Sequence, residues 1–536
     1  MHERQGMNRR RRIGLVAVAA GVVLTASSLA PAAATSYPAG PQSAARCSSG
    51  VPGDVNGDGF AEVAVGESGN AKKRGSVHVF YGQRSGLVTD ATGSARNDHY
   101  FTQDTRGVPG KAEAGDAFGT STLLADFNGD GCADLAVGSP GENDSTGWVQ
   151  VFFGSPTGLK TSGVQSFTLA QIPGSPAGAP DQELGDELAA GDLDGDGIDD
   201  LVAGVDGLRV DGKEAAGGVA VVYGGASGLQ LKRSVMLTRD TPGIPGESGV
   251  NVAFGAAVAT GDFDGDGATE LAVGSANGAT GGTIQTVKRT PDGFTGSEPI
   301  GPDSAGMPGQ ADRFCAFGFV LASGDVHGDG RDDLAVGDPT FGCHDEPEVE
   351  FGKGSVVLLA GSENGLTTSN SQLWTQDSPG VAGTARLGNV FGEALAMAPL
   401  DKGTRADLVI GAPGDLDGGS VTVLLGGPDG LTTDGIGGTR FTQGTPGIPG
   451  TPESEDAFGD VVTLPYLQSR AQATLVIGVP QEDVGSIRSA GAIIQLPVGA
   501  SGPDAGKAKT FTANTRGVQG KAGADELFGG GPRRWG

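Results

Sequence analysis

Five short acidic segments contain the residues best suited to chemistry in this chain. Each has the pattern Asp-x-(Asp/Asn/His)-Gly-Asp-Gly-x-x-(Asp/Glu) and runs into an apolar stretch that ends in glycine. The five copies begin at Asp54, Asp126, Asp192, Asp262 and Asp325. Oxygen atoms at alternate positions, with glycines that allow sharp backbone turns, suit a hard cation that takes six to eight oxygen ligands. The pattern therefore predicts Ca2+ at up to five sites.

The predicted ligands occupy positions 1, 3, 5, 7 and 9 of each loop. The full set is Asp54, Asn56, Asp58, Phe60, Glu62, Asp126, Asn128, Asp130, Cys132, Asp134, Asp192, Asp194, Asp196, Ile198, Asp200, Asp262, Asp264, Asp266, Ala268, Glu270, Asp325, His327, Asp329, Arg331 and Asp333. His327 weakens the fifth site, because imidazole is a poor partner for calcium. The alternative is that these segments are solvated turns, but carboxylates held together without a cation would repel one another.

An EF-hand is a competing interpretation of the loops. Its loop needs an acidic residue at position 12 and flanking amphipathic helices. Position 12 is instead apolar in every copy, at Val65, Val137, Ala203, Val273 and Val336. These residues lie in predicted strands, so the loops are expected to join strands and not helices.

The acidic loops belong to a longer repeat of constant internal length. A Phe-Gly pair precedes most of them, and 19 residues separate its glycine from the glycine that closes the apolar stretch, as from Gly119 to Gly138. Two further blocks keep this length without the acidic pattern. Their loops at 399–407 and 466–474 are predicted to be empty of metal. The strand pair is therefore the constant feature, and the metal is an accessory to it.

Valine-rich runs bounded by Gly, Pro, Asn and Asp follow each block and are typical of strands. Four strands per repeat, repeated seven times, predict an all-β fold, a seven-bladed β-propeller over residues 47–530. The first acidic loop lacks a Phe-Gly pair, and the last pair, Phe528-Gly529, lacks an acidic loop. The C-terminal strand is therefore expected to complete the N-terminal blade and to remove an exposed sheet edge.

The Phe-Gly pairs, the acidic loops and the Gly-x-Pro segments at 138–140, 337–339, 411–413 and 478–480 together resemble the FG-GAP repeats of the integrin α-chain propeller. The resemblance covers residues 47–530. It implies calcium in loops on one face of the ring and ligand binding on the other. The chain resembles a bacterial secreted branch of that family, because the sequence contains no transmembrane helix and no inserted DxSxS-type metal domain.

The N-terminus predicts export. Residues 1–34 have a basic start at Arg9–Arg12, an apolar stretch and an Ala-Ala-Ala cleavage site, which is typical of a signal peptide; Sec and twin-arginine export both stay open. Residues 35–46 are expected to be a disordered leader and 531–536 a tail. Removing residues 1–34 takes the net charge from −28 to about −32. Such a charge argues against nucleic acids and anionic membranes as partners.

Four cysteines remain after removal of the signal peptide, an even number that suits an oxidising compartment. Cys315 and Cys343 flank the start and the end of the fifth block, so they are predicted to pair. Cys47 and Cys132 would then form the second disulfide and attach the N-terminal segment to the second blade. Other pairings stay open.

No catalytic motif is present: the sequence has no GxSxG, P-loop or HExxH pattern. The favoured hypothesis is a secreted, monomeric, non-catalytic module that binds an extracellular protein or a glycan without inserting into a membrane. The alternative is a hydrolase or polysaccharide lyase with its site at the centre of the ring. Its candidate acids follow the closing glycines, at Glu142, Asp144, Asp206, Asp338, Asp415, Glu482 and Asp483. A structural role in the cell envelope is a third hypothesis.

Overall fold

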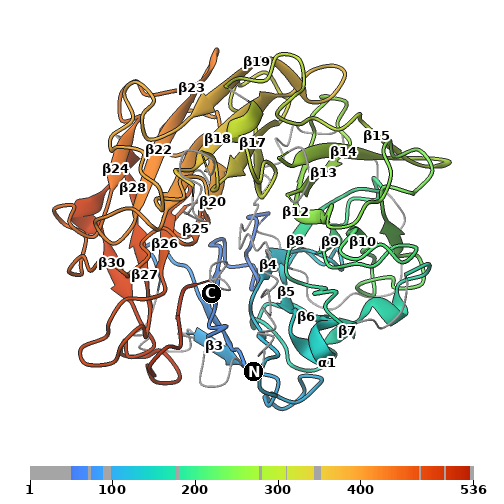
Figure 1. Ribbon diagram of the computed structural model, residues 1–536. Coiled ribbons are helices and arrows are strands. Elements are labelled where there is room, and N and C mark those ends of the chain that lie inside the picture. The colour runs from blue at the N-terminus through green and yellow to red at the C-terminus, as the bar shows by residue number, and fades with distance from the viewer. Residues whose placement is uncertain are drawn as a thin grey trace, which may run out of the picture.

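The computed structural model describes residues 47, 50–69, 74–87, 98–175, 180–276, 281–309, 311–342, 352–469, 472–499 and 502–530. It confirms the predicted fold, because seven antiparallel sheets are arranged in a ring as the blades of a propeller (Figure 1). Helix in the described residues is limited to one turn, α1 (Glu142–Ser145), and three 3-10 turns, η1 (Leu169–Gln171), η2 (Ala311–Arg313) and η3 (Ala505–Lys507).

The blades follow one another in chain order. The first three contain β1 (Val63–Gly66), β2 (Val77–Phe80) and β3 (Asp98–Phe101); β4 (Thr122–Ala125), β5 (Asp134–Ser139), β6 (Trp148–Phe152) and β7 (Gln165–Phe167); and β8 (Leu188–Gly191), β9 (Asp200–Val205), β10 (Gly218–Val222) and β11 (Val235–Leu237). The fourth and fifth contain β12 (Phe254–Gly261), β13 (Glu270–Ser275), β14 (Thr283–Thr290) and β15 (Gly293–Gly296); and β16 (Val320–Gly324), β17 (Asp333–Asp338), β18 (Ser355–Ala360) and β19 (Thr367–Trp374).

The sixth and seventh blades carry additional short strands. The sixth contains β20 (Ala394–Ala398), β21 (Asp407–Ala412), β22 (Ser420–Gly427) and β24 (Thr439–Phe441), with β23 (Gly430–Thr432) paired to the end of β22. The seventh contains β25 (Val462–Thr463), β26 (Leu475–Val479), β27 (Ala492–Leu496) and β30 (Lys509–Phe511), with a small hairpin of β28 (Val498–Gly499) and β29 (Gly502–Pro503). In the first blade, the described residues supply three strands.

The hydrophobic core is divided among the gaps between blades. Second strands such as β5 are buried along their whole length, because both faces of each sheet are covered, so they are apolar without alternation. Seven clusters of buried side chains lie between the blades; six draw on two neighbouring blades, and the one between the fifth and sixth blades also includes Ala253, Ala256 and Ala276 of the fourth. The phenylalanines of the Phe-Gly pairs lie in these gaps and are fully buried.

The constant 19-residue block has a direct structural cause. The N–H of Gly119 donates a hydrogen bond to the carbonyl of Gly138, 2.9 Å away, and the sixth and seventh blades repeat the bond between the matching glycines. The closing glycine also meets the next blade, since a Cβ added to Gly138 would collide with the carbonyl oxygen of Gly185. Gly119 has a φ of 89°, and an added Cβ there would lie 2.6 Å from the carbonyl oxygen of Ser76, so glycine is required at both ends of the block.

The C-terminal Phe-Gly pair closes the ring. Gly529 donates to the carbonyl of Gly66 at 3.2 Å, and Gly530 forms a parallel bridge with Glu67. Phe528 is fully buried in the cluster shared by the seventh and first blades. The last Phe-Gly pair thus takes the position that the first block lacks, as the sequence predicted.

The predicted signal peptide, leader and tail (residues 1–34, 35–46 and 531–536) lie outside the described residues. Within the part of the chain that the structure describes, no helix has the length and apolarity needed to cross a membrane.

Candidate metal sites

The first aspartate of each acidic loop organises the turn. In the third loop, one oxygen of Asp192 accepts hydrogen bonds from the N–H groups of Gly195 (2.7 Å) and Asp196 (3.0 Å), and the other accepts from Gly197 (2.8 Å). Asp262 and Asp325 hold their loops in the same way. The two loop glycines have positive φ, 76° and 84° in the third loop, which favours glycine strongly.

The acid at position 9 fastens the loop to the blade. One oxygen of Asp200 accepts from the N–H of Leu193 at 2.9 Å, and the other accepts from Gly224, at the end of the third strand, also at 2.9 Å. The sixth loop lacks most of the acidic pattern but retains this arrangement, because Asp407 accepts from Leu400 and Gly426. The acid at position 9 therefore holds the loop against the blade, whether or not the loop has the other acids.

Three of the five loops gather their carboxylates into compact groups. Candidate ligand atoms lie within 4.8 Å of one another in the sets Asp54, Asp58 and Glu62; Asp192, Asp194 and Asp200; and Asp262, Asp264, Asp266 and Glu270. Among the described residues, no such set forms in the second and fifth loops. The residues at position 7 have no carboxylate, so they could bind a cation only through their main-chain carbonyls.

Burial raises the pKa of several of the acids at position 9. The pKa of Asp200 rises to about 7 and that of Asp407 to about 6, and those of Glu62 and Asp134 rise well above their usual range. Neighbouring loop carboxylates add to the increase in the first three loops. A buried cation would offset this cost, so the donor sets of the first and third loops, where the ligand atoms lie close together, fit a hard divalent ion.

Basic side chains approach three of the loops, and sequence reasoning missed two of them. The ammonium of Lys288 lies 2.7 Å from Asp264, 2.7 Å from Asp266 and 2.9 Å from Glu270. Among the acids of the third loop, Arg233 contacts only Asp194, at 2.8 Å. In the fifth loop, Nδ1 of His327 lies 2.9 Å from Asp333.

Several adjacent loops are joined to one another by backbone hydrogen bonds. The N–H at position 8 donates to the carbonyl at position 1 of the preceding loop, as from Ala133 to Asp54 at 2.9 Å and from Ala406 to Asp325 at 2.8 Å. Position 8 is aspartate in the third and fifth loops, and there Asp199 and Asp332 also accept the N–H of Asp126 and Asp262. Burial raises the pKa of Asp199 to about 6 and that of Asp332 to about 7.

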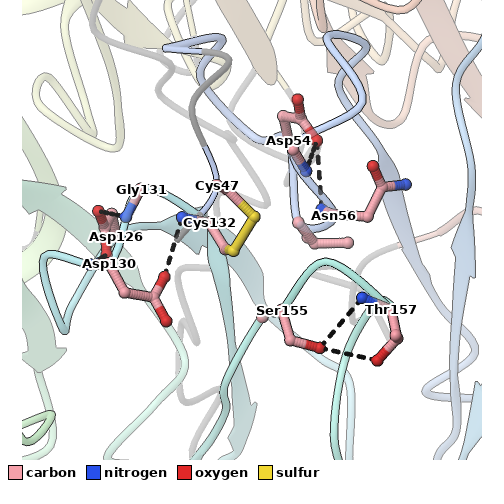
Figure 2. Close-up of a disulfide and its surroundings, with 12 residues drawn as sticks. Cys47, Asp54, Asn56, Asp126, Asp130, Gly131, Cys132, Ser155 and Thr157 are labelled. Carbon is pink, nitrogen blue, oxygen red and sulfur yellow. Dashed lines mark hydrogen bonds between the residues drawn. A yellow bond between two sulfur atoms is a disulfide. The ribbon is translucent and has the colours of Figure 1, made fainter. Parts of the chain in front are cut away.

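A disulfide reinforces the junction between the first two loops. Cys47 is bonded to Cys132, the residue at position 7 of the second loop (Figure 2). The N–H of Cys47 donates to the carbonyl of Asp130 at 3.2 Å. Cys47 also packs against Gly57 of the first loop. The N-terminal segment is thereby attached to the second blade, as predicted. The other predicted pair includes Cys343, which lies outside the described residues.

The acids considered for catalysis are spread over five blades, and most have structural partners. Glu142 and Glu482 accept hydrogen bonds from Gln103 (2.7 Å) and Gln443 (2.6 Å), each of which belongs to the preceding blade. Asp415 is held by Gln376, Ser420 and Arg440. Asp206, Asp338 and Asp483 accept from backbone or hydroxyl groups close in the chain. These contacts hold loops in place between blades.

Comparison with known proteins agrees with the geometry. The FG-GAP repeat model matches residues 48–80, 118–152 and 254–287. Integrin alpha-PS2 of Drosophila melanogaster is 27% identical over 364 residues, which are 62% of this chain and 23% of that protein. Phosphatidylinositol-glycan-specific phospholipase D of Bos taurus is 32% identical over 184 residues, 32% of this chain and 20% of that protein.

Among solved structures, a rhamnogalacturonan lyase, YesW, aligns with a TM-score of 0.33 and 14% identity over 67% of this chain and 58% of that one. The chain spans less than a quarter of the length of the integrin and the phospholipase that it matches. The same conclusion follows from the matched repeats, from the integrin α relatives and from the seven blades. The chain contains FG-GAP repeats and folds as a seven-bladed β-propeller similar to that of the integrin α chains.

Proposed function

We propose that this propeller is a calcium-stabilised, extracellular binding module without catalytic activity, and that its ligand is a protein or a glycan. The observation that carries the proposal is the compact arrangement of acids in the first and third loops, on turns already folded by their own aspartates and glycines. Calcium there would neutralise buried carboxylates and hold adjacent loops together. The disulfide between Cys47 and Cys132 supports a location outside the cytoplasm.

The first and third loops would hold the ion with the side chains at positions 1, 3, 5 and 9. In the third loop these are Asp192, Asp194, Asp196 and Asp200. The main-chain carbonyl of Ile198 would supply a further oxygen, as position 7 does in other calcium loops. The structural hydrogen bonds of Glu142, Asp415 and Glu482 support the non-catalytic assignment over the lyase or hydrolase alternative.

The test is a binding screen of the exported form against a glycan and cell-wall polysaccharide array and against extracellular proteins. It is run in calcium and in chelator, with the melting temperature measured in both. We expect the melting temperature to fall in chelator, because an ion bound to the folded state alone stabilises it by mass action. An unchanged melting temperature would refute the calcium assignment. Turnover of an arrayed glycan by purified protein would favour the enzyme alternative.

A further inference from the structure

The fourth blade differs from the others where its third strand ends. Lys288 follows Val287, which pairs with Leu271 on the neighbouring strand. The same register in the other blades places Tyr81, Phe153, Tyr223, Ala360, Leu425 and Pro497 at this position. A basic residue at this position is therefore specific to the fourth blade. The acidic loop of the same blade is also the one in which four carboxylates gather.

The next residue departs from the repeat as well. In the second, third, fifth and sixth blades it is a glycine whose N–H donates to the acid at position 9, from Gly154, Gly224, Gly361 and Gly426 at 2.8–3.0 Å. The fourth blade has Arg289 there, and its Nε donates to the hydroxyl of Tyr223, on the preceding blade, at 3.1 Å. The position-9 acid of this loop, Glu270, meets the Lys288 ammonium instead.

The contacts of Lys288 match those expected of a bound cation. An ammonium has three N–H donors, and three carboxylates, at positions 3, 5 and 9, surround Nζ at 2.7–2.9 Å. The Lys288 side chain is only 26% exposed, so these ion pairs are better shielded from water than ordinary surface pairs. Arg233 in the third loop differs, because it reaches position 3 alone and its side chain is 47% exposed.

We propose that Lys288 is a built-in cation of the fourth loop, so that this loop stays folded without Ca2+ and does not bind the ion that its sequence predicts. The inference rests on the proposed calcium binding by the other loops. It deepens that proposal, since a loop with a complete acidic pattern would be independent of the metal. In calcium-poor surroundings, the fourth blade would remain ordered while its metal-binding neighbours loosen.

Calcium stoichiometry measured by native mass spectrometry tests the inference. The wild type is compared with Lys288→Met, which keeps the apolar stem but removes the ammonium. The matched control is Arg289→Met, which removes the same charge from the adjacent residue, whose side chain contacts the third blade. We expect Lys288→Met to bind one more calcium ion than the wild type and to melt at a lower temperature in chelator. Arg289→Met should bind the wild-type number.

An equal count in Lys288→Met and wild type would overturn the inference, because calcium would then already displace the ammonium. A wild type that binds no calcium would refute the proposed function, whereas a single ion gained by Lys288→Met would still support the inference. Lys288→Tyr is the second variant if Lys288→Met fails to fold, because tyrosine stands at this position in the first and third blades. It too should gain one ion, and a wild-type count in it would overturn the inference.

Discussion

Single glycines set how closely neighbouring blades approach. Gly411 closes the sixth block within β21, and an added Cβ would collide with the carbonyl oxygen of Gly459 on the seventh blade. The obstacle is backbone, which no change of rotamer can move. Six further closing glycines meet the next blade in the same way, at Gly66, Gly138, Gly204, Gly274, Gly337 and Gly478. Their identity is therefore fixed by packing and not only by a turn.

Replacing Gly411 with alanine should reduce the free energy of unfolding by about 3 kcal/mol, near the upper end of overpacking costs. The sixth loop lacks the acidic pattern, so the effect should not depend on calcium. Denaturant unfolding measures it, with Gly444→Ala as the control, because a Cβ at that exposed glycine would meet no atom closer than 3.4 Å. Equal losses in the two variants would show that the contact between blades is not the cause.

At the scale of strands, the seam between the last blade and the first contains a buried charged cluster. Imidazole nitrogens of His78, on β2, lie 3.1 Å from Asp98 and 3.5 Å from Glu67. Gln519, from the C-terminal region, donates its backbone N–H to Asp98 at 3.0 Å, and Phe528 packs edge-on against the imidazole. The cluster therefore links the strand that begins the ring to the segment that closes it.

The seam should respond to pH through His78. Burial lowers the pKa of His78, but its hydrogen bonds with Asp98 and Glu67 outweigh burial and raise the pKa overall. Glu526 also interacts electrostatically with His78. A raised folded-state pKa gives stability that is fully present below the unfolded value of about 6.5 and is lost as the pH rises through the folded value.

Melting temperatures of the wild type and His78→Gln, measured in saturating calcium from pH 5.5 to 8.5, test this expectation. The advantage of the wild type should be largest at the acidic end and shrink as the pH rises. His99→Gln is the control, because His99 lies on the neighbouring β3 and bonds to Tyr81 outside the cluster. A gap between wild type and His78→Gln that does not change with pH would contradict a charged His78.

At the scale of the whole molecule, the ring is held by repeated contacts between neighbouring blades and by a disulfide between residues far apart in the sequence. Seven apolar clusters and the bonds between successive loops join each blade to the next. The disulfide joins Cys47 to Cys132, which are 85 residues apart in the sequence, and it fixes the start of the propeller beside its second blade. Cross-links over such long segments restrict the unfolded chain strongly.

Replacing both Cys47 and Cys132 with serine should reduce the free energy of unfolding by about 2–4 kcal/mol, the usual contribution of a native disulfide. Thermal or denaturant unfolding in calcium measures the loss. The double variant isolates this bond better than a reductant does, because a reductant would also attack any bond between Cys315 and Cys343. A variant as stable as the wild type would show that blade packing alone positions the N-terminal segment.

The sequence alone predicted the seven blades, the 19-residue block and the acidic turns, because each depends on residues close together in the chain. Aspartate at position 1 and glycines at positions 4 and 6 fold the loop by local hydrogen bonds, so their spacing is sufficient evidence. The pairing of Cys47 with Cys132 was one of several possibilities in the sequence, and the fold brings their Cα atoms to 4.9 Å.

Only the tertiary structure decided which side chains face the loops from other strands. Lys288 is 22 residues from Asp266 in the sequence, and its approach to that carboxylate depends on the register of β14 against β13. His78 likewise contacts Asp98 on a neighbouring strand, and Asp332 accepts a hydrogen bond from the N–H of Asp262 on the preceding blade. Such contacts follow from strand register and blade packing, which the local pattern of residue types does not specify.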